Sequence, residues 1–260
     1  MLSGCIYQQY LQQITHYFIK CRLITGNFFI LQVKPLDQLP RMRIYDDTYR
    51  HKGLRKQLMD LLRSNGITDE NVLAAMNNIP RHYFLDSALE LTAYEDRAFP
   101  IGDGQTISQP YTVAYQTQLL KIQPHDKVLE IGTGSVYQAT VLAEMGAKVF
   151  TIERQKNLYE KSKSFVFKKK YPHLKFFYGD GFEGLPTYAP FDKVIITAAA
   201  PFIPPKLIEQ LKTGGLMVIP VNEGDDKQRM HRLTKQADGT YVEESFDAFS
   251  FVPMLTGKNG

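Results

Sequence analysis

The sequence predicts an α/β fold, with a mostly parallel central sheet, helices on both faces and an antiparallel hairpin near the C-terminal end. Short apolar segments alternate with helical segments through the middle of the chain. This alternation is typical of βαβ units, in which a helix joins two parallel strands. The expected parallel strands are residues 128–131, 149–152, 174–178 and 193–197.

The chain before the first of these strands is expected to be helical. A leucine-rich face predicts a helix over 53–65. The Thr-Asp-Glu segment at 68–70 begins a second helix, because acidic residues are favourable in a first turn, and this helix ends before Pro80. Prolines and glycines in 94–111 indicate a loop, and a third helix is expected over 112–122.

Further helices and turns separate the strands. We expect a helix over 137–145 that ends at Gly146, a lysine-rich helix from after 152 to about 170, and a helix from Pro204-Pro205 to 211. Gly214-Gly215 indicates a turn into a strand over 216–221. The Asp238-Gly239 turn predicts a hairpin between 232–235 and 240–246.

The first 41 residues differ in composition from the rest of the chain. They hold both cysteines, Cys5 and Cys21, and few charges. We therefore expect 1–41 to be a poorly ordered appendage, or a non-native start that precedes Met42. The remaining residues, 42–260, form one domain, with a helical and loop part over 42–111 and an α/β part over 112–260.

Composition excludes several classes of protein. With 31 basic and 27 acidic residues, the net charge of +4 gives no reason to expect a nucleic-acid binder. Two cysteines cannot form a disulfide framework, so we expect a reducing compartment, the cytoplasm. No apolar stretch reaches the roughly 20 residues that span a membrane, and the six scattered histidines indicate no zinc site.

Candidate ligand-binding residues lie at the ends of three successive strands. Glu130 precedes the turn Gly132-x-Gly134, Glu153 ends the second strand, and Asp180 follows the third. Glycines allow a tight turn beside helix N–H groups, and an acid about 20 residues later can accept hydrogen bonds from ribose hydroxyls. Each feature alone also fits an ordinary turn or a solvated acid. Together, at one edge of a sheet, they favour a nucleotide-type ligand.

A wider set of segments identifies a family. These segments are Ile79-Pro80-Arg81, 97–102, Gly104-Gln105-Thr106-Ile107-Ser108-Gln109-Pro110, 130–139, Ile152-Glu153-Arg154, Gly179-Asp180-Gly181, Pro190-Phe191-Asp192, 197–200 and Phe251-Val252-Pro253. In this order, over roughly residues 50–255, the chain resembles the protein-L-isoaspartate O-methyltransferases. The loop around Ser108 is specific to that family, whereas the glycine turn is shared by methyltransferases that use S-adenosylmethionine.

The resemblance implies a class I methyltransferase fold and a repair function. Such enzymes transfer a methyl group from S-adenosylmethionine to the free carboxylate of L-isoaspartyl residues in damaged proteins and peptides, which starts repair through a succinimide. The implied partners are these proteins and peptides, with no nucleic acid and no membrane, and the chain is expected to be a monomer. A carboxylate is already ionised at pH 7, so the chemistry needs positioning rather than a general base.

The resemblance also implies site residues. The cofactor would lie against Glu130, Gly132, Thr133, Gly134, Ser135, Tyr137, Gln138, Glu153, Arg154, Asp180 and Gly181. Ser108 is the expected catalytic residue, as a hydrogen-bond donor to the isoaspartyl carboxylate. The substrate would also lie against Thr106, Ile107, Gln109, Pro110, Thr197, Ala198 and Ala199.

One residue departs from the family pattern. Val136 stands where the family has a third glycine, and its β-branched side chain adds bulk near the cofactor unless it points away. Two other functions stay open on the sequence: a carboxyl methyltransferase for a small-molecule acid, and a non-catalytic scaffold whose cofactor pocket Val136 impairs. A nicotinamide oxidoreductase fits the flanking segments less well.

Overall fold

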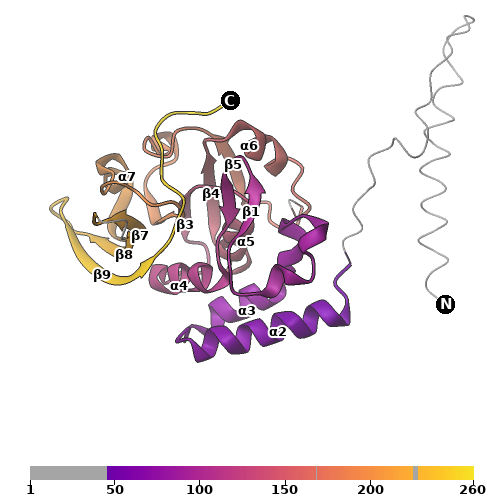
Figure 1. The fold of residues 1–260 in the computed structure, drawn as a ribbon. Coiled ribbons are helices and arrows are strands. Elements are labelled where there is room, and N and C mark those ends of the chain that lie inside the picture. The colour runs from indigo at the N-terminus through magenta and orange to yellow at the C-terminus, as the bar shows by residue number, and fades with distance from the viewer. Residues whose placement is uncertain (1–45, 168, 225–227) are drawn as a thin grey trace, which may run out of the picture. The chain divides into compact units, whose positions relative to one another are not determined.

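The computed structural model describes residues 46–167, 169–224 and 228–260 (Figure 1). The expected appendage over 1–41 and its boundary lie outside these residues. The described part is built around a seven-stranded sheet and also contains a two-stranded sheet.

The seven-stranded sheet has the order β5-β4-β3-β6-β7-β8-β9. Its strands are β3 (Lys127–Ile131), β4 (Lys148–Glu153), β5 (Lys175–Tyr178), β6 (Phe191–Ile196), β7 (Leu211–Asn222), β8 (Gln228–Lys235) and β9 (Tyr241–Phe249). Strands β3 to β7 pair in parallel, while β8 pairs antiparallel with both β7 and β9. The predicted mostly parallel sheet and its antiparallel C-terminal hairpin are therefore confirmed.

The strand order reverses between β3 and β6. From β3 the chain moves outward through β4 to β5, and then returns to place β6 on the other side of β3. The connections that leave β3 and β6 therefore diverge to opposite sides. In open α/β sheets this divergence forms a crevice at the carboxyl ends of the strands, where ligands bind.

Together with short 3₁₀ helices, six α-helices are present in the described residues. They are α2 (Tyr49–Ser64), α3 (Glu70–Asn78), α4 (Pro110–Leu120), α5 (Tyr137–Glu144), α6 (Lys156–Ser162) and α7 (Pro205–Glu209). Helix α3 begins within the expected segment, and Asp69 precedes its first turn as the N-cap, where its carboxylate accepts the N–H of Asn71. Helix α2 begins four residues earlier than predicted, because the Thr48 hydroxyl accepts the N–H of His51 and completes a cap there.

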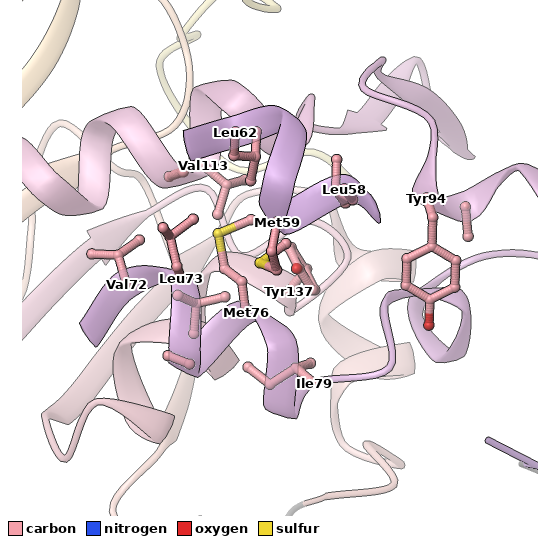
Figure 2. Close-up of a cluster of buried hydrophobic side chains, with 14 of the residues drawn as sticks. Leu58, Met59, Leu62, Val72, Leu73, Met76, Ile79, Tyr94, Val113 and Tyr137 are labelled. Carbon is pink, nitrogen blue, oxygen red and sulfur yellow. The ribbon is translucent and has the colours of Figure 1, made fainter. Parts of the chain in front are cut away.

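Helices α2 and α3 pack on each other and on the start of the α/β part (Figure 1). Figure 2 shows the apolar cluster between them, which includes Leu62, Met76, Val113 of α4 and Tyr137 of α5. Their side chains are no more than 2% exposed. This cluster fixes the helical part against the two helices that flank the crevice.

The segment 94–111 is not the loop expected from its prolines and glycines. It contains a hairpin of β1 (Phe99–Gly102) and β2 (Gln105–Ile107). Phe99 and Ile107 are paired partners, and both are buried. The turn at 102–104 has positive φ at all three residues, which Gly-Asp-Gly accommodates, so the same residues that suggested a loop form a tight hairpin.

Two other boundaries differ from expectation. Helix α6 ends at Ser162 rather than near residue 170. Phe165 and Phe167 both pack on one apolar cluster, although residues two apart on a helix point to nearly opposite sides, so the helix must end before them. Strand β7 begins at Leu211, and Gly214-Gly215 lies inside it, at the irregular part of its pairing with β6.

Candidate active site

One cavity lies at the carboxyl ends of β3, β4 and β6. It contains about 810 Å³ of space, counted with its opening to solvent. Predicted site residues that line it are Thr106, Ile107, Ser108, Gly132, Thr133, Gly134, Ser135, Tyr137, Gln138, Glu153, Arg154, Gly181, Thr197 and Ala198. The residues expected to hold the cofactor and those expected to hold the substrate therefore open into the same space.

The glycine turn after β3 approaches its neighbours too closely for a side chain. Gly132 has φ +100, and a Cβ there would lie 2.5 Å from the Thr197 hydroxyl oxygen. That hydroxyl lies 2.9 Å from the Gly132 carbonyl and 3.0 Å from the Ile131 carbonyl. The backbone of the turn is thus held against β6, and only glycine fits at 132.

Val136 adopts a left-handed backbone conformation at the start of α5. It is the N-cap residue, with φ +73 and ψ 0, which is uncommon for a β-branched residue. Its side chain is buried with Leu142 and Val149 in an apolar cluster and does not line the cavity. The valine therefore keeps the backbone shape that a glycine would give and directs its bulk away from the cavity.

Glu153 connects the end of β4 to the glycine turn. Its Oε2 accepts the N–H of Gly134 at 2.8 Å, and its Oε1 accepts the N–H of Gln155 at 2.8 Å. Burial raises the pKa of this carboxyl, and the two N–H donors oppose that rise. Each carboxylate oxygen can accept more than one hydrogen bond, so both can also accept from a ligand's hydroxyl groups.

Glu130 is placed differently from the sequence expectation. Its side chain is fully buried and does not line the cavity, and neither carboxyl oxygen makes a hydrogen bond of ordinary geometry to another described residue. Burial raises its pKa to about 8 and the neighbouring Glu153 carboxyl adds to the rise, while the Thr151 hydroxyl and the Ala139 N–H oppose it. At neutral pH this carboxyl is therefore mostly protonated.

Asp180 also lies outside the cavity lining. Its Oδ1 accepts the N–H of Phe182 at 2.9 Å, and its Oδ2 accepts the N–H of Gly257 at 2.6 Å. The adjacent Gly181 does line the cavity. Asp180 thus fixes the loop that carries Gly181 and joins it to the C-terminal segment.

The Ser108 loop forms the other wall of the cavity. Its hydroxyl makes no hydrogen bond to another described residue, whereas its carbonyl accepts from Arg81 at 2.8 Å. Gln109 and Pro110 do not line the cavity, since Gln109 donates to Asp96 and Pro110 is the first residue of α4. Ala199 lies outside too, in a bridge with Pro253.

Sequence reasoning did not assign the C-terminal segment to the site. Val252, Pro253, Met254 and Leu255 line the cavity. The N–H of Met254 donates to the Ala199 carbonyl at 2.7 Å, so this segment adds to the carboxyl edge of the sheet. The Phe-Val-Pro motif at 251–253, which served only to identify the family, is the signal that could have found it. Gln105, Val113, Ile131 and Ile152 complete the lining.

The structure also brings together Asp47, His51 and His82, whose ligand-type atoms lie within 4.8 Å of one another. Sequence spacing could not show this group, since His82 is 31 residues from His51. The Asp47 carboxylate is paired with the Arg55 guanidinium at 2.9 and 3.0 Å, and Nε2 of His51 lies 2.9 Å from Glu90. Because a cation is already paired with the carboxylate, we assign no metal to the group.

Charged side chains are few in the cavity. Only Glu153 and Arg154 carry a formal charge among its lining residues, and Arg154 donates to the carbonyls of Thr256 and Gly257. The lining contains no histidine or cysteine that would act as a base or nucleophile. The arrangement can hold two molecules in contact, and positioning is sufficient for a transfer between groups that are already reactive.

Comparisons with known proteins show the family of the chain. A family model described as protein-L-isoaspartate(D-aspartate) O-methyltransferase matches residues 53–259. A protein-L-isoaspartate O-methyltransferase of Cytophaga hutchinsonii is 57% identical over 216 residues, which cover 83% of this chain and 96% of the relative. One of Christiangramia forsetii is 54% identical over 213 residues, which cover 82% of this chain and 99% of the relative.

Solved structures agree in fold. A structure named protein-L-isoaspartate O-methyltransferase matches with a TM-score of 0.70 and 27% identity, over 76% of this chain and 65% of its own. A putative enzyme of the same name from Plasmodium falciparum, in complex with S-adenosyl-L-homocysteine, has a TM-score of 0.67 and 24% identity, over 77% of this chain and 98% of its own. The predicted class I methyltransferase fold is confirmed. In the described part of the chain, no helix has the length and apolar character to cross a bilayer.

Proposed function

Because the chain belongs to the protein-L-isoaspartate(D-aspartate) O-methyltransferase family, we propose that the cavity at the carboxyl ends of β3, β4 and β6 holds both reactants. The enzyme transfers a methyl group from S-adenosylmethionine to the free carboxylate of L-isoaspartyl residues in damaged proteins and peptides, which starts their repair. The observation that carries our assignment of the site is that the glycine turn, Glu153 and the Ser108 loop all line one space.

The cofactor half is the glycine turn and the end of β4. When bound, S-adenosylmethionine supplies an electrophilic methyl group on a sulfonium centre. Gly132 allows the backbone to approach a ligand closely, and Glu153 accepts hydrogen bonds from the ribose hydroxyls while it holds the N–H of Gly134. Thr133, Ser135, Tyr137, Gln138, Arg154 and Gly181 form the remaining wall on this side.

Two acids act from outside the cavity lining. We assign Glu130 a supporting place beneath the glycine turn rather than a contact with the cofactor, because its carboxyl is fully buried. Asp180 holds the C-terminal segment through the N–H of Gly257, and Gly181 makes the contact with the cofactor instead.

The substrate half is the Ser108 loop together with Thr197 and Ala198. Ser108 is the hydrogen-bond donor to the isoaspartyl carboxylate, since its hydroxyl has no hydrogen-bond partner among the described residues. The Thr197 hydroxyl already lies within hydrogen-bond distance of the carbonyls of Ile131 and Gly132, so it holds the turn in place. Thr106 and Ile107 shape the approach to Ser108.

Methyl transfer to a matched pair of peptides tests this function. Labelled S-adenosylmethionine is supplied with a peptide that contains isoaspartate, or with the same peptide containing aspartate. We expect label in the isoaspartyl peptide and almost none in the aspartyl peptide. Equal labelling of both peptides, or of neither, contradicts the assignment, and label in free small acids favours a small-molecule methyltransferase.

The remaining expectations concern the setting of the enzyme. The finer proposal is a monomer that works in the cytoplasm on proteins and peptides, without nucleic acid or membrane. The presence of only two cysteines supports a reducing compartment. Sedimentation of the purified full chain with and without an isoaspartyl peptide measures the oligomeric state.

A further inference from the structure

Arg81 is a fully buried cation beside the proposed substrate loop. It lies at the start of a 3₁₀ helix over Arg81–Phe84, and its side chain has no exposed surface. Its Nε donates to the Ala93 carbonyl at 2.9 Å, and its Nη2 donates to the Ser108 carbonyl at 2.8 Å. Its Nη1 has no hydrogen-bond partner among the described residues.

A buried guanidinium in this setting is unfavourable for folding. Burial lowers the pKa of Arg81 to about 10, so the group remains charged at neutral pH. Its two strong hydrogen bonds go to neutral carbonyls rather than to a carboxylate, although buried charges are normally paired, and the nearby Tyr137 hydroxyl and Asp96 carboxylate offset the effect of burial only in part. The buried Arg55, by contrast, has its guanidinium paired with the Asp47 carboxylate. Because Arg81 lacks such an ion pair, its burial points to a role beyond folding.

Arg81 contacts residues on both walls of the cavity. Its guanidinium carbon lies 4.8 Å from the centre of the Tyr137 ring, and its Nη2 holds the Ser108 carbonyl. Both Ser108 and Tyr137 line the cavity. Figure 2 shows the Tyr137 ring within the apolar cluster beside Met59 and Met76, so the ring that Arg81 contacts is closely packed on this side.

A second anchor follows directly after Ser108. The Asp96 carboxylate accepts from Nε2 of Gln109 at 3.0 Å and from the N–H of Tyr111 at 2.8 Å. The peptide that carries Ser108 is therefore fixed by Arg81 on its carbonyl and by Asp96 just beyond it. These contacts hold the backbone of Ser108, and therefore the point from which its hydroxyl reaches the cavity.

We propose that Arg81 is a positioning residue for the isoaspartyl carboxylate. It fixes the orientation of Ser108 through the Ser108 carbonyl, and it places a positive charge behind a wall that receives an anion. This inference rests on the proposed function. Because the charge attracts the carboxylate most strongly before the carboxylate is neutralised by methylation, Arg81 acts mainly on substrate binding.

The test compares steady-state methylation of an isoaspartyl peptide by the full chain and its variants. Arg81→Met removes the charge and both hydrogen bonds at similar length, and Arg81→Lys keeps the charge but not the planar fork. Arg55→Met is the control: Arg55 is also buried and lies 5.9 Å from the Tyr94 ring, but its hydrogen bonds go to Asp47 and Tyr94, which do not line the cavity. Calorimetry with S-adenosylhomocysteine measures the cofactor site separately.

We expect Arg81→Met to raise the KM for the peptide at least tenfold, with kcat and the Kd for S-adenosylhomocysteine each within threefold of wild type. Arg81→Lys raises KM at least threefold. Arg55→Met lowers the melting temperature but leaves KM within twofold. If Arg81→Met does not fold, the KM of Arg81→Lys tests the proposal, and it should rise at least threefold.

Two results overturn the proposal. One is a KM within twofold of wild type in the folded Arg81 variants, and the other is a parallel rise of KM and of the S-adenosylhomocysteine Kd, which indicates a general loss of structure. Failure of the proposed function is distinguishable, because the wild-type chain then does not methylate the peptide at all.

Discussion

Replacing Glu153 by glutamine is expected to weaken cofactor binding strongly. The carboxylate accepts the N–H of Gly134 on one oxygen and the N–H of Gln155 on the other, each at 2.8 Å. A glutamine can satisfy only one of these donors, and its NH₂ group faces the other N–H. The change therefore removes a charged acceptor from the ribose hydroxyls and also releases one end of the glycine turn.

The size of the effect follows from these hydrogen bonds. A hydrogen bond to a charged group contributes about 1.5–3 kcal/mol, and loss of one such bond corresponds to roughly 10- to 150-fold weaker binding. Glu153→Ala removes both acceptors and is expected to lose at least as much. The KM for the isoaspartyl peptide is expected to change much less, because Glu153 lies on the cofactor side of the cavity.

Calorimetric titration with S-adenosylhomocysteine measures this prediction. Glu160→Gln is a matched control, since Glu160 lies on the neighbouring helix α6, is exposed and is paired only with Lys163. Glu160→Gln carries the same change of charge, and the dissociation constant of S-adenosylhomocysteine from this variant should stay within twofold of the wild-type value. An unchanged dissociation constant in Glu153→Gln would refute the role assigned to this carboxyl.

Three further predictions concern Glu130, Val136 and the N-terminal segment. The pKa of Glu130 is raised from 4.5 to about 8 in the folded state. Between these two pH values the folded state binds more protons than the unfolded state, so the free energy of unfolding falls as pH rises. Urea unfolding should therefore show the advantage of Glu130→Gln over wild type growing between pH 5 and pH 8, and a constant difference would contradict the assignment. The left-handed conformation of residue 136 costs about 1–2 kcal/mol for a residue with a Cβ, and glycine avoids this cost. Val136→Gly and Val136→Ala both lose the packing of the valine side chain, so the glycine variant should be at least as stable as the alanine variant. Val136→Gly should also keep its cofactor affinity. Thermal melting compares the two variants. In a helix interior, glycine is less stable than alanine by about 0.5–1 kcal/mol. If Val136→Gly is less stable than Val136→Ala by about 1 kcal/mol or more, residue 136 behaves like a helix-interior position and the prediction is wrong. A chain that starts at Met42 should melt and methylate like the full chain, and aggregation or a melting point many degrees lower would show that residues 1–41 belong to the fold.

The sequence predicted the features that depend on local pattern. Alternating apolar segments predicted the sheet, and the glycine turn with Glu153 at the next strand end predicted where one side of the cavity lies. These signals are local because a helix between two strands favours parallel pairing through a right-handed crossover, whereas the order of the strands was not predicted. The Ser108 loop could be placed opposite them only through its resemblance to a family.

The features that the sequence did not predict depend on packing between distant segments. Nothing near Glu130 in the chain shows that its carboxyl is buried below the turn rather than exposed to the cavity. The contact of Arg81 with Ser108 joins residues 27 apart. The left-handed backbone of Val136 was also hidden, because a β-branched residue normally disfavours that conformation.

The central claim is that cofactor and substrate meet in the cavity between Glu153 and Ser108. A crystal structure of the full chain with S-adenosylhomocysteine and an isoaspartyl peptide tests it most directly. We expect the ribose hydroxyls to donate to the Glu153 carboxylate. We also expect an oxygen of the isoaspartyl carboxylate to accept from the Ser108 hydroxyl and to face the sulfur of S-adenosylhomocysteine. A ribose bound away from Glu153, or a peptide carboxylate that makes no contact with the Ser108 loop, would contradict the account.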